Sequence, residues 1–211
     1  MDYKTAEDIS VWNRRRAGIL FLAFLAGCAL QPKMIAPNYV PPRTIAVLPM
    51  ANQSTDLRGP EYVRQVLIRN LESRGYIVAP VKETDEILRT KLGITDGGQM
   101  GSAVPAKICQ ALKVDAAVYG ELIDFKFLNV GVYQNKLVEA RFKLVGKDGQ
   151  ALWEDQRKAS RKYIGTSLKE ARNALAIGLA EKMVGNILKA PLYEQVQQVV
   201  RMAVSTLPKA K

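Results

Sequence analysis

Side chains able to do chemistry are scarce in this chain of 211 residues. It contains no histidine and only two cysteines, Cys28 and Cys109, which excludes imidazole catalysis and a zinc site with four thiolates. The carboxylates are scattered, and no spacing among them specifies a pair of acids or a metal site. We therefore expect no catalytic residue, no metal and no cofactor, and a protein that is not an enzyme.

Cys28 lies at the end of a pattern typical of a signal peptide. Three arginines at 14–16 precede an apolar run at 17–25, which is too short for the roughly 20 residues of a membrane-spanning helix. The following tetrapeptide resembles the lipobox of bacterial lipoproteins: Leu25, Ala26, Gly27 and Cys28. This resemblance implies cleavage after residue 27, with diacylglycerol attached to the Cys28 thiol.

Acyl chains on Cys28 would anchor the protein to a membrane, because each buried methylene contributes about 0.8 kcal/mol. By analogy with other lipoproteins, Ala29 at the next position implies sorting to the outer membrane, with the folded domain in the periplasm. The formal charge of the whole chain is +11. The basic residues are spread over every predicted element rather than clustered, so no nucleic-acid partner is expected.

Two further segments invite a chemical interpretation. The glycine-rich stretch 97–102 lacks the Lys-Ser/Thr pair of a P-loop and follows no predicted strand, so we interpret it as a flexible loop in which Ser102 caps a helix. Cys109 lies in a short apolar-faced helix and is expected to be a small core residue rather than a reactive thiol.

A polar loop follows the first predicted strand, at the carboxyl end where open α/β sheets place their ligands. Its candidate residues for contact with a partner are Asn52, Ser54, Asp56 and Arg58. A plain turn in which Asp56 caps the next helix is the alternative interpretation.

The chain is expected to contain a signal peptide at 1–27, a lipidated cysteine and Pro-rich tether at 28–43, and one domain at 44–207. The domain begins with a βαβ unit: a strand at 44–50, a helix from Pro60 closed by Gly75, and a parallel strand at 76–81. Helices at 82–92 and around Cys109 lead to a third strand at 115–120.

Strands then follow one another. We predict strands at 122–132 and 136–145 around a turn at 133–135, and the Asp148-Gly149 turn returns the chain into a strand from Ala151. Apolar residues at intervals of three and four predict helices at 168–187 and 196–207. The expected fold is an α/β (α+β) domain of three-layer type: a mixed sheet begun by a βαβ unit, extended by antiparallel hairpins, with C-terminal helices packed on it.

The strand at 43–52 resembles the opening strand of a group of cell-envelope proteins that includes CsgG, the N-terminal domain of TolB, and LpoB. With the segments 75–78, 113–120, 144–149 and 152–154, in that order, the chain resembles a lipoprotein family with a TolB-N-like domain, often found beside a CsgG-like protein. The resemblance covers about residues 25 to 190. The family's usual acidic residue near Val81 is displaced here, with Asp85 the nearest.

The resemblance implies an accessory or structural component of a cell-envelope assembly, with other envelope lipoproteins and a CsgG-like protein as expected partners. One alternative is a subunit of a CsgG-like oligomeric secretion channel, for which the alternating Val138, Ala140, Phe142 and Leu144 would face lipid. Another is an LpoB-like activator of a peptidoglycan synthase. Oligomer formation stays open.

Overall fold

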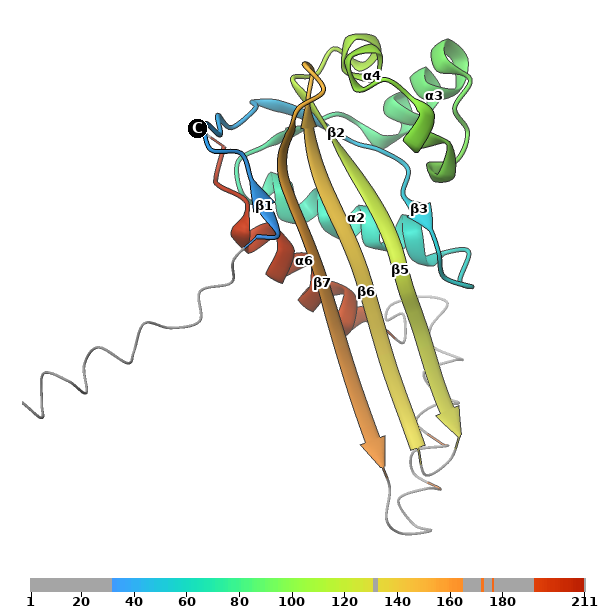
Figure 1. Cartoon of the computed structure of the whole chain (residues 1–211). Coiled ribbons are helices and arrows are strands. Elements are labelled where there is room, and N and C mark those ends of the chain that lie inside the picture. Colours follow the sequence, from blue (N-terminus) through green and yellow to red (C-terminus); the bar gives the residue numbers. More distant parts are fainter. Residues whose placement is uncertain (1–31, 131–132, 165–171, 173–175, 177–191, 211) are drawn as a thin grey trace, which may run out of the picture. The chain divides into compact units, whose positions relative to one another are not determined.

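The computed structural model describes residues 32–130, 133–164, 172, 176 and 192–210 (Figure 1). The first half of the domain alternates strand and helix, and the second half is mainly strand. In order, the elements are β1 (Met34–Ile35), β2 (Thr44–Val47), β3 (Ala51–Asn52), α2 (Gly59–Glu72), β4 (Ile77–Val78), α3 (Val81–Leu92), the 3-10 helix η2 (Gly97–Ser102), α4 (Pro105–Leu112), β5 (Ala116–Val130), β6 (Tyr133–Gly146), β7 (Ala151–Ile164) and α6 (Tyr193–Thr206).

The seven strands form one mixed sheet in the order β1-β7-β6-β5-β2-β4, with β3 paired to β5 beside β2. β2 and β4 are parallel neighbours joined by α2, so the predicted βαβ unit is confirmed. Pro60 lies in the first turn of α2, where its missing N–H breaks no helical hydrogen bond. β5 also pairs parallel with β2, and the two hairpins that follow are antiparallel.

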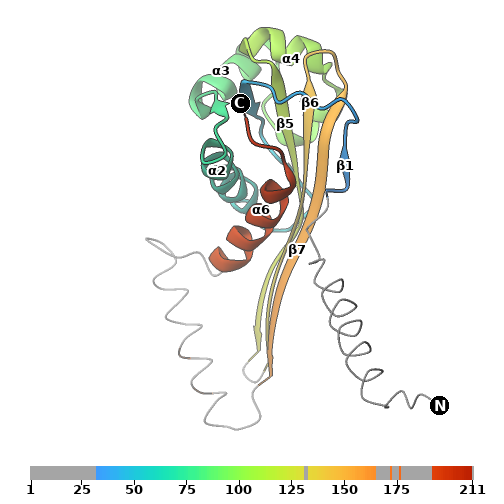
Figure 2. The same ribbon diagram turned by 90° about the vertical axis from the view of Figure 1, so that its left-hand side faces the viewer.

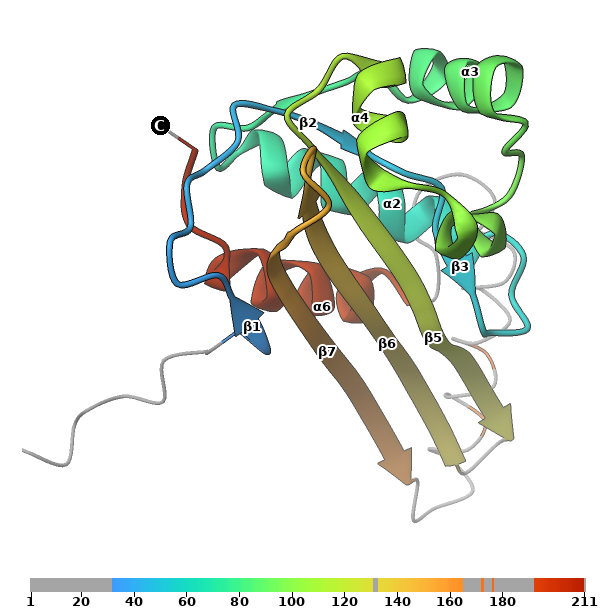
Figure 3. The same cartoon turned by 45° about the horizontal axis from the view of Figure 1, so that its top comes forward.

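Helices cover both faces of this sheet, which confirms the predicted fold class. α2 and α6 pack on one face, which we call the inner face, and α3 and α4 pack on the opposite, outer face near β2 (Figures 2 and 3). The inner-face core contains Val138, Ala140, Phe142 and Leu144, whose side chains are completely buried. The apolar side of β6 therefore packs against protein in this chain.

Two details of the predicted strands were wrong. The segments at 115–120 and 122–132 form a single strand, β5, with a register shift between Leu122 and Asp124. The extra residue reverses the alternation of side chains beyond it, so Phe125, three residues after Leu122, packs on the same inner face. The predicted turn at 133–135 is also displaced, because Tyr133 already pairs with Val130. The turn at Asp148-Gly149 is confirmed, with Gly149 at φ +82°.

The described N-terminal segment differs from the predicted free tether. Met34 and Ile35 pair antiparallel with Glu154 and Trp153, which adds β1 to the edge of the sheet. Further on, the Tyr39 hydroxyl lies 2.8 Å from that of Tyr76, and burial is the main cause that raises the pKa of both phenols. Pairing with the sheet therefore includes residues about ten positions before Thr44.

At the C-terminus, α6 confirms the second predicted helix, which packs on the inner face through Val196, Val199 and Val200. The predicted helix at 168–187 and its end at Pro191 lie outside the described residues except at Arg172 and Ala176, which are both helical. The predicted signal peptide at 1–27 also lies outside them. Within the described part of the chain, no helix is both long enough and apolar enough to cross a membrane.

Candidate functional site

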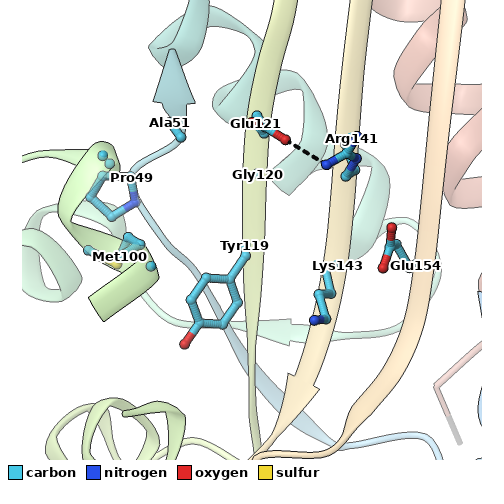
Figure 4. A pocket seen from close by; sticks show the side chains of 12 residues that line it. Pro49, Ala51, Met100, Tyr119, Gly120, Glu121, Arg141, Lys143 and Glu154 are labelled. Atoms are coloured by element: carbon cyan, nitrogen blue, oxygen red, sulfur yellow. Dashed lines mark ion pairs between the residues drawn. The ribbon is translucent and has the colours of Figure 1, made fainter. Parts of the chain in front are cut away.

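A pocket of about 350 Å³ opens on the outer face, where the sheet extends beyond α3 and α4 (Figure 4). Its floor is formed by side chains of β5, β6 and β7, and its wall by β3 and η2. It is lined by Pro49, Ala51, Gly97, Gly98, Met100, Gly101, Tyr119, Gly120, Glu121, Arg141, Lys143 and Glu154. The strand register explains this grouping, because Arg141 lies opposite Glu121 and Lys143 lies between Tyr119 and Glu154.

Ion pairs organise the charged floor of the pocket. The Arg141 guanidinium lies 3.1 Å from a Glu121 carboxylate oxygen and also donates to Gln156 on β7. Glu154 accepts from Lys33 at 2.8 Å, and this hydrogen bond is the main cause that lowers the pKa of the Glu154 carboxyl. The pocket therefore presents charges of both signs, fixed in place by neighbouring strands.

Tyr119 lines the pocket and also packs against the outer-face core, which contains Cys109. Burial raises the pKa of Tyr119 to about 12, and the Tyr119 hydroxyl finds no hydrogen-bond partner among the described residues. Cys109 is buried in the outer-face core, as predicted, and burial raises the pKa of its thiol. A thiol held protonated is a poor nucleophile, which fits a core residue.

The glycine-rich segment forms the wall as a 3-10 helix rather than a flexible loop. Asp96 and Gln99 form a capping box at its start: the Asp96 carboxylate accepts from Gly98 N–H, and the Gln99 side chain accepts from Asp96 N–H. Ser102 does not cap α4, contrary to prediction. Its hydroxyl donates to the Gln99 carbonyl, and the N-cap position of α4 is Val104.

The predicted contact residues at 52–58 lie beside the pocket and mainly bond to one another. Asn52 Oδ1 accepts from the backbone and the hydroxyl of Ser54, while Asn52 Nδ2 donates to the Asp56 carbonyl. Asp56 Oδ1 accepts from the backbone N–H groups of Arg58 and of Gly59, the first residue of α2, but the N-cap position of α2 is Arg58, so the predicted cap is displaced by two residues. These bonds hold the loop in one shape.

Two features of this region escaped the sequence analysis. Leu57 has no predicted role, yet its side chain is 91% exposed near the end of the bonded loop, two residues before α2. Gln53 was also overlooked, and its side chain donates a short hydrogen bond to Glu121 that joins the loop to the floor of the pocket. Only the register of β3 with β5 brings these residues together.

A buried arginine beneath the loop was missed as well. Arg64 on α2 is only 2% exposed, and its guanidinium donates twice to the Val47 carbonyl, at 3.1 and 2.8 Å. The same group forms a bidentate pair with Asp85 on α3, at 2.8 and 2.6 Å. Asp85, which is displaced from the position of the acidic residue usual in the resembling family, therefore has a partner. The Arg64–Asp85 pair joins α2, α3 and the carboxyl end of β2.

Chemically, the described arrangement suits the binding of polar and charged groups. Within the described residues, no cluster of three or more His, Cys, Asp or Glu side chains could hold a metal ion. The pocket carboxylates instead accept from Arg141, Gln53 and Lys33. The absence of cofactor and catalysis stays a prediction. The predicted lipobox, Leu25, Ala26, Gly27 and Cys28, lies outside the described residues and stays a prediction.

Comparison with known proteins identifies relatives of this domain. The family model described as "Putative lipoprotein GNA1162-like" matches residues 38–210. The crystal structure of lipoprotein GNA1162 from Neisseria meningitidis superimposes with a TM-score of 0.53 at 20% identity, covering 69% of this chain and 99% of that one. At this identity, the likeness supports a shared fold.

Two other solved structures are more distant. The PelC dodecamer from Paraburkholderia phytofirmans has a TM-score of 0.49 at 10% identity, covering 84% of this chain and 96% of that one. The LpoB C-terminal domain from Salmonella enterica has a TM-score of 0.43 at 11% identity, covering 59% and 87%. Comparison with curated protein sequences gives no match.

Proposed function

Since the chain belongs to the GNA1162-like lipoprotein family, we propose that it is a lipid-anchored accessory component of a cell-envelope assembly. Acyl chains on Cys28 hold it to the outer membrane, and the domain faces the periplasm. The rigid loop at 52–58 and the adjoining outer-face pocket bind a partner protein. A CsgG-like envelope lipoprotein is the expected partner, as implied by the resemblance to a lipoprotein family often found beside a CsgG-like protein.

The exposed Leu57 side chain is the observation that carries this proposal. A large apolar side chain that is 91% exposed leaves water only when another molecule covers it, and that burial contributes favourable free energy to binding. Hydrogen bonds among Asn52, Ser54 and Asp56 already hold the loop, so little conformational entropy remains to be lost on binding. The paired charges of the adjoining pocket supply the polar rim typical of a protein interface.

Changing Leu57 to aspartate is expected to reduce recovery of the partner about tenfold, because an anchor residue at an interface contributes roughly 1–2 kcal/mol. The measurement is affinity purification of the tagged, lipidated protein from gently solubilised envelopes, with quantification of the co-purifying proteins. Val40→Asp is the matched control, since Val40 is 75% exposed and lies away from the loop. Recovery with this control should equal that of the unchanged protein.

The identity of the co-purifying protein separates the alternatives. A CsgG-like lipoprotein would support the proposed assembly, whereas a peptidoglycan synthase stimulated by the purified protein would favour an activator. Recovery of the protein by itself, or a partner whose recovery is the same for Leu57→Asp and Val40→Asp, would contradict the proposed docking loop.

Changing Cys28 to alanine is expected to abolish acylation, because the thiol is the atom that receives the diacylglycerol. Cells grown with radioactive palmitate should label the unchanged protein and leave the Cys28→Ala variant unlabelled. Cys109→Ala is the control and should retain the label, since Cys109 is buried in the core. Equal labelling of the Cys28→Ala variant would contradict the anchor.

A further inference from the structure

The ordered domain begins very close to the proposed lipid anchor. Lys33 forms an ion pair with Glu154, and Met34 starts β1, so the chain needs only five Cα-to-Cα steps from Cys28 to a residue bound to the sheet. A fully extended chain covers at most about 3.6 Å per residue, which limits this connection to about 18 Å. A lipidated Cys28 therefore keeps Lys33 within about 18 Å of the membrane surface, which brings the domain within reach of lipid.

The far end of the β5–β6–β7 sheet carries exposed apolar side chains. β5 and β7 extend well beyond α6 at this end (Figure 1). The register places Val130, Tyr133 and Ile164 in one row across the three strands, with Leu128 and Lys162 in the next row on the same face. Val130 is 58% exposed and Ile164 is 69% exposed. We call these five residues the distal patch.

Basic side chains dominate the strand that borders the distal patch. Between Arg157 and Lys162, β7 carries four basic residues and no acidic one. Three of the four are engaged with carboxylates, and within the described residues no ion pair is found for Lys162. Those three pairs are Arg157–Asp155, Lys158–Glu139 and Arg161–Glu194. Lys158 and Lys162 lie on the same face as the patch, by their alternation along β7.

Exposed apolar side chains next to lysines match the physics of a membrane interface. The apolar groups enter the boundary between headgroups and acyl chains, and the ammonium groups pair with anionic lipid phosphates. β1 runs antiparallel to β7, and it is the strand through which the chain joins Cys28 to the sheet. β1 meets β7 at Trp153 and Glu154, ten residues before Ile164, and because the pairing is antiparallel, the N-terminal end of β1 faces the part of β7 that carries the basic residues.

We propose that the distal patch, Leu128, Val130, Tyr133, Lys162 and Ile164, docks on the anionic lipid surface to which Cys28 is anchored. This inference rests on the proposed lipidation of Cys28. Docking through the patch would place the distal end of the β5–β6–β7 sheet at the lipid surface. β3, which leads into the loop at 52–58, pairs with Glu121 and Leu122 in the middle of β5, so the loop stays clear of that end and available to a partner.

An environment-sensitive fluorophore on the lipidated protein tests this docking. We place NBD on Ile164→Cys and, in a second protein, on Gln150→Cys at the opposite end of β7. Cys28 is blocked by its lipid and Cys109 is buried, so neither competes for the label. In vesicles rich in phosphatidylglycerol, we expect the label at 164 to shift to the blue and to be quenched by brominated lipids, and the label at 150 to stay water-like.

Charge reversal then tests the role of the lysine. Lys162→Glu should lower the shielded fraction of the label at 164 on the order of tenfold, because each basic residue near an anionic surface strengthens binding severalfold. Lys107→Glu on α4 makes the same change in net charge on an exposed site away from the patch, and should leave the shielded fraction unchanged. Shielding should also weaken in phosphatidylcholine vesicles.

Three results would overturn the inference. A water-like label at 164 in protein that floats with the vesicles would show a domain that stands away from the lipid, with the anchor intact. Shielding at 164 that needs no vesicles and grows with protein concentration would show that a second copy covers the patch. Protein that fails to float with the vesicles would instead contradict the lipid anchor, and with it the docking of the distal patch that depends on this anchor.

Discussion

Replacing Arg64 by alanine is expected to lower the free energy of unfolding by about 2–3 kcal/mol, because it removes a buried guanidinium and its two hydrogen bonds to a main-chain carbonyl, together with an ion pair to the partly exposed Asp85. The change leaves the Val47 carbonyl without either guanidinium donor and removes the cation that faces Asp85. It also empties a site that is 2% exposed. Urea unfolding of the purified protein at neutral pH measures the loss.

Arg89→Ala is the matched control for the buried arginine. Arg89 pairs with Glu86 on the exposed side of α3, where both side chains are more than half exposed. Pairs of this kind contribute about 0–1 kcal/mol, so the unfolding midpoint should barely move. Asp85→Ala combined with Arg64→Ala should be less destabilising than the sum of the single changes, because the two residues interact directly. Equal midpoints for the Arg64 and Arg89 variants would contradict the buried pair.

Adding one methyl group at Gly97 is expected to destabilise the protein by about 2–3 kcal/mol, the cost of overpacking a close contact. A Cβ at this position would lie 2.1 Å from the carbonyl carbon and oxygen of Met50, far closer than atoms of two residues can approach. The obstacle is backbone, so η2 would have to move away from β3. Thermal unfolding of Gly97→Ala measures the loss.

Gly101→Ala in the same 3-10 helix is the control, since a Cβ there meets nothing within 4 Å. It should change stability by no more than about 0.5 kcal/mol, as expected of an open surface site. Because Gly97 also lines the outer-face pocket, Gly97→Ala should weaken partner recovery as well. A Gly97→Ala protein that unfolds at the same temperature as Gly101→Ala would show that η2 does not pack on Met50.

Local patterns predicted most of the secondary structure correctly. The apolar run at β2, the helix after Pro60 and the Asp148-Gly149 turn each carry a signal within a few residues, and each is confirmed. The β5–β6 connection was misplaced because Tyr133 and its neighbours pair with residues that precede the turn. Pairing energy between strands, rather than turn preference, decides such a boundary.

The cross-strand neighbours of the pocket residues could not be predicted from the sequence. Arg141 and Lys143 could be placed on one face of a strand by alternation, but their position opposite Glu121 and between Tyr119 and Glu154 depends on register. Arg64 did leave a signal, because it lies three and seven residues before the core residues Leu67 and Leu71. An arginine at that spacing on a helix faces the core and requires a buried partner.

Features confined to one short segment could be read from the sequence alone: the absence of imidazole, the resemblance of residues 25–28 to a lipobox, and the alternation of the βαβ unit. Tertiary structure decided which distant groups meet. Only the folded sheet brings Lys33 to Glu154 and so shortens the chain between the anchor and the domain, and only strand register gathers the distal patch. The physical reason is that pairing across a sheet depends on all its strands at once, whereas a helix, a turn or a cleavage site depends mainly on its neighbours in the chain.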